Sequence, residues 1–132
     1  MSTENEVMEA AAEVVAAFGS HDTEKYFRCF SPEASFLFYS SNRRLNSRQE
    51  YEEEWKSWEK DGFKVHSCLS SDAKVTLYAE SRVAIFTHSV RTDLTMGGQR
   101  MTNSERETIV FEHVGGSWLA IHEHLSPDPN LI

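Results

Sequence analysis

The feature that most constrains the fold of this chain is a pair of glycines near its end. Gly115-Gly116 separates two runs, 104–114 and 117–127, that are rich in Thr, Ile, Val, Phe, Trp and Leu. A two-residue Gly-Gly link between such runs is a strong signal for an antiparallel hairpin, because its turn positions need positive φ. The sequence therefore predicts a β-hairpin that reverses at residues 115 and 116.

The position of this turn also predicts a register. Counting outward from the glycines places Glu107 opposite His124. Because side chains alternate across a strand, one face of the hairpin would carry Glu107, His122 and His124, and the other would carry Arg106 and Glu123. Both faces are apolar near the turn. This pattern predicts a hairpin inside a larger sheet that is covered on both sides.

The preceding residues alternate between helical and strand patterns. Apolar residues recur at helical spacing over 3–18, 24–30 and 48–60. Strand patterns cover 34–40, 63–71 with its continuation 74–78, 82–94 and 101–114. The order predicts an α+β fold with three helices from the first half of the chain packed on one face of a curved, mixed or antiparallel sheet. A chain of 132 residues fits one domain, and we expect residues 1–132 to form it.

Charge and composition exclude several classes of partner. The formal net charge of −8 disfavours nucleic acid and anionic membranes, which both require a basic surface. The chain also has no apolar run close to the roughly 20 residues of a membrane span. Two cysteines, Cys29 and Cys68, with no secretory signal before them favour free thiols and a cytoplasmic location.

The element order and three late motifs resemble a known superfamily. The motifs are Arg106-x-Thr108, Gly116-x-Trp118 and His122-x-His124-x-Ser126. Together they resemble the SnoaL-like branch of the nuclear transport factor 2-like superfamily, and they are also similar to the association domain of calcium/calmodulin-dependent protein kinase II. The resemblance implies a cone-shaped fold whose helices and concave sheet face enclose a pocket. It also implies a homodimer through the convex sheet face.

The ionisable residues at the far end of the hairpin are the predicted acid/base centre. A carboxylate beside an imidazole fixes one tautomer and raises the basicity of the ring. We therefore predict His124 as general acid or base and Glu107 as the group that orients it. His122 and Tyr39 complete the predicted catalytic set.

Aromatic residues predict an apolar ligand pocket. Such a pocket would desolvate an ionisable group that reached it and shift its pKa. The predicted lining residues are Phe36, Phe38, Trp55, Trp58, Phe63 and Trp118, with Arg106 to bind a substrate carboxylate. An alternative interpretation makes the aromatic residues simple core and pairs Arg106 with Glu123 across a dimer seam.

These observations favour a protein that binds a small apolar organic molecule. The chemistry implied by the resemblance is cofactor-free isomerisation, cyclisation or dehydration, since the sequence has no phosphate loop or dinucleotide fingerprint. Two alternatives stay open. One is a module for ligand binding or assembly without turnover, and the other is a metal-dependent enzyme. In the second, His122 and His124 would bind the ion with Glu107, His66 or His88.

Overall fold

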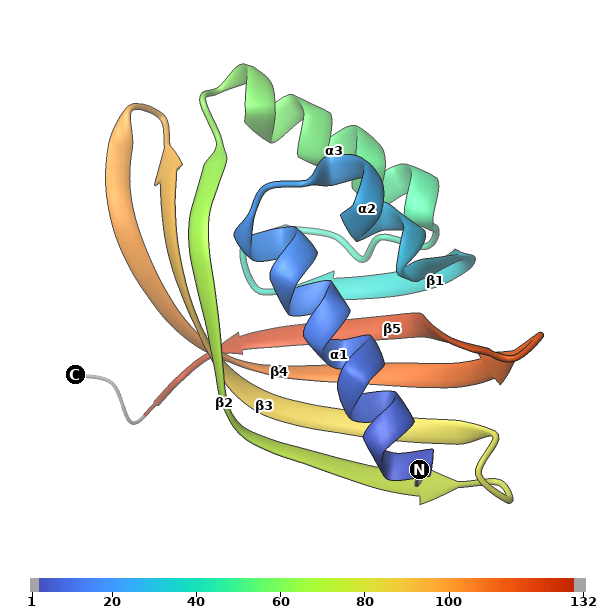
Figure 1. The fold of residues 1–132 in the computed structure, drawn as a ribbon. Coiled ribbons are helices and arrows are strands. Elements are labelled where there is room, and N and C mark those ends of the chain that lie inside the picture. Colours follow the sequence, from blue (N-terminus) through green and yellow to red (C-terminus); the bar gives the residue numbers. More distant parts are fainter. Residues whose placement is uncertain (1–2, 130–132) are drawn as a thin grey trace.

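The structure, a computed structural model, describes residues 3–129 (Figure 1). These residues form three helices and five strands. In chain order they are α1 (Thr3–Gly19), α2 (Thr23–Arg28), β1 (Phe30–Phe38), α3 (Arg48–Lys60), β2 (Lys64–Tyr78), β3 (Val83–Met96), β4 (Gln99–Val114) and β5 (Ser117–Pro127). The predicted α+β fold is confirmed.

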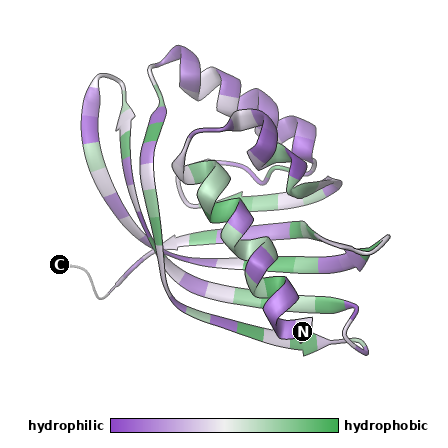
Figure 2. Ribbon diagram, in the orientation of Figure 1, coloured by the Kyte–Doolittle hydropathy of each residue, from purple (hydrophilic) through white to green (hydrophobic). Residues whose placement is uncertain are grey.

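The five strands make a mixed sheet in the order β1-β5-β4-β3-β2. β1 runs parallel to β5, while the other neighbours are antiparallel. The sheet bends strongly, and the three helices lie on its concave side (Figure 1). Apolar and polar residues alternate along the strands (Figure 2), as expected when successive side chains point to opposite faces.

β1 begins earlier than the sequence predicted. A helix was expected to run to Phe30, but α2 ends at Arg28 and Phe30 already pairs with Ala120 of β5. The strand therefore contains Pro32, which lies before the predicted strand start at residue 34. Proline is tolerated here because β1 lies at the edge of the sheet, where a missing backbone N–H breaks no ladder.

The C-terminal hairpin reverses at the predicted glycines, but its register shifts within the strands, between Phe111 and Val110. Gly115 and Gly116 have φ values of 55° and 83°, and Val114 pairs with Ser117. Phe111 still pairs with Ala120, whereas Val110 pairs with His122, so Ile121 is an extra residue in β5. Such a β-bulge reverses which face every later residue occupies. The predicted pairing of Glu107 with His124 is therefore wrong.

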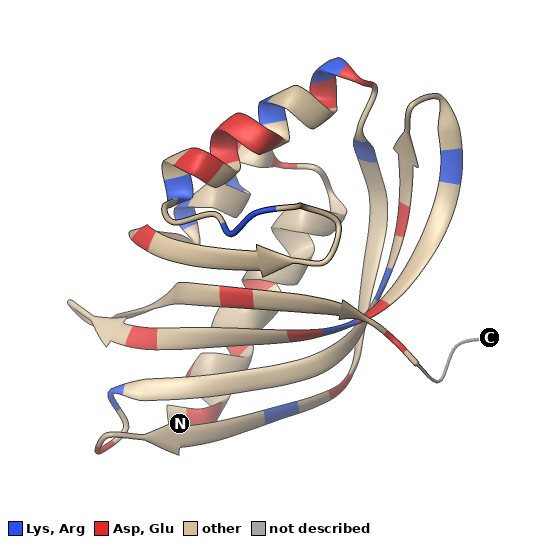
Figure 3. Cartoon of the chain, turned by 180° about the vertical axis from the view of Figure 1, so that it is seen from behind, with Lys and Arg blue, Asp and Glu red and all other residues tan. Residues whose placement is uncertain are grey.

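The core is an aromatic cluster between the helices and the concave face. Trp55 of α3 is fully buried, and its ring centroid lies 5.3 Å from that of Tyr26 and 5.0 Å from that of Phe63. The opposite side of α3 carries acidic residues exposed to solvent (Figure 3). This division of one helix between apolar and charged faces fixes which side of α3 meets the sheet. No helix within residues 3–129 is both long and apolar enough to cross a membrane.

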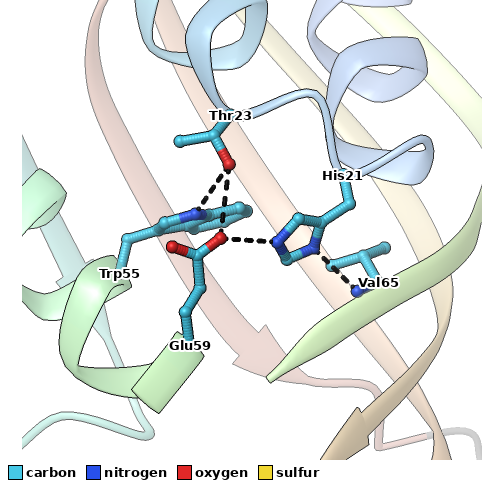
Figure 4. A network of polar contacts seen from close by, with 5 residues as sticks. All are labelled: His21, Thr23, Trp55, Glu59 and Val65. Carbon is cyan, nitrogen blue, oxygen red and sulfur yellow. Dashed lines mark hydrogen bonds and ion pairs between the residues drawn. The ribbon is translucent and has the colours of Figure 1, made fainter. Parts of the chain in front are cut away.

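His21 ties the break between α1 and α2 to α3 and β2 (Figure 4). Its Nδ1 accepts a hydrogen bond from the backbone N–H of Val65 at 2.9 Å, so the proton of a neutral ring lies on Nε2. Nε2 donates to Glu59 Oε2 at 2.8 Å. The His21 side chain is only 8 % exposed. Long-range partners on α3 and β2 therefore enclose the ring.

Replacing His21 by alanine is expected to lower the free energy of unfolding by about 1–3 kcal/mol, because the buried N–H of Val65 loses its acceptor. Glu59→Ala is the matched control. It removes the partner of the same ring on its half-exposed side, and it should cost no more than about 1 kcal/mol. Urea unfolding followed by circular dichroism measures both. Equal losses in the two variants would contradict the structural role assigned to the His21–Val65 bond.

Candidate functional site

A cavity of about 300 Å³ lies between the concave sheet face and the helices. All three helices and all five strands contribute to its walls, mainly the C-terminal half of α1, the inner side of α3 and the bent strands β3 and β4. Most lining residues are apolar or aromatic, including Phe18, Phe38, Trp58, Phe63 and Leu94. Three glutamates interrupt this apolar lining. They are Glu105, Glu107 and Glu123.

Glu107 and Glu123 form a hydrogen-bonded pair in the buried part of the wall. Glu107 points inward because it lies on the same face of β4 as Ile109 and Phe111, which are both fully buried. Glu123 points inward because of the extra residue Ile121 in β5. Its Oε1 is buried and has no hydrogen-bond partner within residues 3–129. A buried polar atom without a partner is costly, so it marks a place where a ligand group would be stabilised.

The two carboxyls of this pair have opposite pKa shifts. Burial, the negative charge of Glu107 and the hydrogen bond to it raise the pKa of Glu123 well above its ordinary value. Burial also disfavours charge on Glu107, but hydrogen bonds from Glu123 and His88 outweigh it and lower the pKa of Glu107. The pair therefore shares one proton, which stays on Glu123 to a higher pH than on an ordinary glutamate, while Glu107 is the carboxyl that ionises first.

His88 supports the charge on Glu107 from the adjacent strand. Its Nε2 lies 2.6 Å from Glu107 Oε1, and its Nδ1 lies 2.6 Å from Ser70 Oγ on β2. The His88 side chain is 0 % exposed. In the tautomer that donates from Nε2 to the Glu107 carboxylate, Nδ1 accepts a hydrogen bond from the Ser70 hydroxyl. Ser70, His88 and Glu107 thus form a continuous hydrogen-bonded chain.

Glu105 is the third acidic group of the cavity, two residues before Glu107 on the same face of β4. Tyr39 donates a hydrogen bond to Glu105 Oε2 at 2.5 Å. Burial raises the pKa of Glu105, the hydrogen bond from Tyr39 opposes that rise, and the charge of Glu107 adds to it. Burial, together with the bond to Glu105 and its charge, raises the pKa of Tyr39. Glu105 is therefore a carboxylate of increased basicity that can accept a proton from a molecule in the cavity.

The structure separates the residues that the sequence had grouped into one acid/base centre. Glu107 faces the cavity, whereas His124 lies exposed on the convex face, where it pairs with Thr108. His122 lies on the same convex face and forms a 2.8 Å hydrogen bond with Ser35. Burial, then the charges of His124 and Arg44, lower the pKa of His122. The predicted His124–Glu107 contact is wrong because the bulge at Ile121 turns the two side chains to opposite faces.

The predicted pocket residues divide into three groups. Phe38, Trp58 and Phe63 line the cavity. Phe36 and Trp55 are fully buried in the core behind it. Trp118 is half-buried against α1 and donates to Glu6 Oε1 at 3.3 Å, and Arg106 lies with His124 in a groove on the convex face. Trp118 and Arg106 are thus outside the cavity wall.

The alternative metal site at His122 and His124 finds no third ligand among residues 3–129. The rings of His122 and His124 lie 6.5 Å apart, while Glu107 and His88 bind each other and face the cavity side. His66 hydrogen-bonds with Thr95 at 2.7 Å. Among residues 3–129, no three histidine, cysteine or acidic side chains gather as a metal site would require.

Sequence reasoning did not name Glu105 as a site residue, and it gave Glu123 and His88 other roles, Glu123 as the partner of Arg106 and His88 as an alternative metal ligand. Gly97 and Gly98 supplied a usable signal for His88, because counting outward from that turn places His88 opposite Glu107, as the structure has it. Glu105 could have been found because it lies on the same face of its strand as the apolar Ile109. Glu123 carried no such signal, since counting from the nearest turn assigns it to the wrong face.

A family model for the SnoaL-like domain matches residues 7–129. This match covers nearly the whole chain, including every strand and most of α1. No curated protein matches the chain.

Solved structures with the same fold come from several bacteria. A candidate calcium/calmodulin-dependent protein kinase II association domain from Xanthomonas campestris is 23 % identical, with a TM-score of 0.77, and the alignment covers 96 % of this chain and 88 % of that one. A protein of unknown function in nutrient uptake from Rhodospirillum rubrum, described as nuclear transport factor 2-like, is 18 % identical over 92 % and 98 %, with a TM-score of 0.78. Another protein of that description from Cytophaga hutchinsonii is 12 % identical over 97 % and 100 %, with a TM-score of 0.81. At these identities the likeness establishes the nuclear transport factor 2-like fold.

Proposed function

The chain belongs to the SnoaL-like domain family, and from that premise we propose that its cavity binds a flat, apolar molecule with one oxygen group and transfers protons on it. The observation that supports this function is the hydrogen-bonded pair Glu107–Glu123 in an otherwise apolar wall. A neutral carboxyl can donate to a carbonyl oxygen or accept from a hydroxyl, so Glu123 suits either oxidation level of the ligand oxygen. A homodimer through the convex face stays a prediction.

The three glutamates have complementary roles in this proposal. Glu105, with its raised pKa, removes a proton from a carbon next to the ligand carbonyl. Glu123 gives its proton to the carbonyl oxygen as the enol forms. Glu107 remains ionised in the resting protein and keeps the Glu123 proton in place through their hydrogen bond. The apolar walls exclude water, which strengthens each of these electrostatic interactions.

Binding of 2-naphthol tests the ligand class, because it is a flat bicyclic molecule with one hydroxyl. We expect Glu123→Leu to weaken its affinity by about tenfold, the effect of one lost buried hydrogen bond of about 1.4 kcal/mol. Naphthalene, which lacks the hydroxyl, should bind the wild type and Glu123→Leu equally well. Isothermal titration calorimetry measures all four pairs. An equal loss of both ligands in the variant, or no binding of 2-naphthol by the wild type, would rule out the proposed role of Glu123.

The proton-transfer step has a separate test. 2-Tetralone is a ketone of the same bicyclic shape, and its enol resembles 2-naphthol. In D2O, the protein should accelerate deuterium incorporation next to the carbonyl, followed by NMR, and Glu105→Gln should slow it by about 100-fold or more. A protein that binds 2-naphthol but leaves the exchange of 2-tetralone unchanged is a binding module without this chemistry.

A further inference from the structure

The carboxyl pair has a second polar connection that leads away from the cavity. Ser70 Oγ, His88 Nδ1, His88 Nε2 and Glu107 Oε1 follow one another through two contacts of 2.6 Å each. Glu107 then bonds to Glu123. Ser70 is exposed to solvent on the edge strand β2 and does not belong to the cavity lining formed by the described residues. The chain of hydrogen bonds thus runs from solvent to the cavity wall.

The local structure of β2 brings Ser70 to His88. The register of β2 and β3 shifts between Ser71 and Lys74, with Asp72 at a φ of 52°. Ser71 pairs with Ser89 and Lys74 pairs with Thr87, so within the described strands His88 has no residue of β2 directly opposite. A β-bulge of this kind interrupts a regular ladder and redirects nearby side chains. At this bulge the hydroxyl of Ser70 takes the position next to the imidazole.

We propose that Ser70 and His88 form a proton path that connects solvent with the Glu107–Glu123 pair independently of the cavity mouth. The inference rests on the proposed function and deepens it. Ser70 passes its hydroxyl proton to His88 Nδ1, His88 passes its Nε2 proton to Glu107, and Ser70 regains a proton from water. The net change is one proton moved from water to Glu107, and the reverse sequence returns it. His88 changes tautomer and carries the same charge before and after the transfer.

Such a path matters when a ligand fills the cavity. Glu123 then gives its proton to the ligand oxygen and would become an anion beside the anion Glu107, which is strongly unfavourable in a buried site. A proton that arrives through His88 neutralises Glu107 and removes this repulsion. With an apolar ligand in place, the cavity offers water little access to the pair, so the route through Ser70 carries the exchange.

Exchange of the shared carboxyl proton with water tests this proposal directly. The proton of a hydrogen bond between a carboxyl and a carboxylate gives a low-field ¹H NMR resonance, and saturation transfer from water measures its exchange rate. The measurement is made on the free protein and with saturating 2-naphthol. We expect Ser70→Ala to slow exchange by about 10- to 100-fold with 2-naphthol bound and by a smaller factor without it. A resonance that is broadened away in the wild type and becomes visible in Ser70→Ala counts as the same result.

Two variants separate a proton path from a structural role. Ser70→Thr keeps a hydroxyl and should retain exchange close to the wild-type rate. Ser71→Ala, the same change one residue later and on the opposite face of β2, should leave the rate unchanged. An exchange rate in Ser70→Ala equal to that of the wild type, both free and with 2-naphthol, overturns the path. Absence of the low-field resonance in every variant instead refutes the shared proton, and with it the function proposed above.

Discussion

Replacing Trp55 by alanine is expected to lower the free energy of unfolding by about 3–5 kcal/mol, the usual cost of removing a buried tryptophan. Trp55 has no exposed surface, and its ring contacts Phe27, Tyr26 and Phe63. Its Nε1 also donates to Thr23 Oγ1 at 3.0 Å, which joins α3 to the start of α2. Because the free energy of unfolding of a domain is only about 5–15 kcal/mol in total, the variant would lose a large share of its stability. Urea unfolding followed by circular dichroism measures the loss.

Trp58→Ala is the matched control for this prediction. Trp58 lies one turn later on the same helix, is half-buried and borders the cavity rather than the centre of the core. The same change there should cost less stability than Trp55→Ala but should weaken 2-naphthol binding. A loss below about 1 kcal/mol for Trp55→Ala would contradict its central place in the core.

Glu123→Gln is expected to make the protein more stable than the wild type as the pH rises. Glu123 has a folded-state pKa well above its ordinary value, so the folded protein keeps a proton that the unfolded chain releases near pH 4.3, roughly the ordinary glutamate pKa. The stability that comes from this proton is present below the unfolded pKa and is lost as the pH rises toward the folded pKa. Glutamine keeps a neutral donor for Glu107 and does not titrate.

The wild type should lose up to about 1.4 kcal/mol per pH unit relative to Glu123→Gln while the pH lies between the unfolded and folded pKa values of Glu123. The contribution of Glu107 to stability changes with pH in the opposite direction. Its pKa is lowered, so its contribution is present above the unfolded pKa and is lost as the pH falls, in both proteins alike. The difference between the two proteins at each pH therefore reports on Glu123.

Urea titrations at several pH values measure this difference. Glu53→Gln, the same change on the exposed side of α3, should follow the wild type at every pH. A constant difference between Glu123→Gln and the wild type from pH 5 to pH 7 would mean that Glu123 is ionised in the folded protein. The shared proton, and the acid role of Glu123, would then be wrong.

Most of the fold could be predicted because helices and turns are specified by residues that are close together in the sequence. The limits of α3 follow from the helical spacing of Tyr51, Trp55 and Trp58, the capping residue Ser47 and the stop at Gly62. The hairpin turn follows from two glycines in positive φ. The start of β1 could not be read in this way, because whether Pro32 is tolerated depends on the strand lying at the edge of the sheet. Edge position is a property of the assembled sheet.

The candidate site was harder to predict, because it depends on a non-local choice of face. Glu107 was singled out and does line the cavity, but its partners were assigned by counting along β5 from the turn. One extra residue, Ile121, defeats that count, and no nearby glycine or proline marks the bulge. His88 meets Glu107 across a different pair of strands, where the count from Gly97 and Gly98 does hold. The acidic site therefore needed the β3–β4 register as well as the β4–β5 register.

The extra residue in β5 has a consequence for how proteins of this shape diversify. The end of the strand carries two sets of side chains on opposite faces. One set is His122 and His124, and the other is Glu123 and Leu125. Inserting or deleting a single codon before position 122 exchanges which set the interior receives, without altering any of those codons. One such insertion or deletion can thus replace acidic side chains in the interior by imidazoles, while the backbone keeps its overall course.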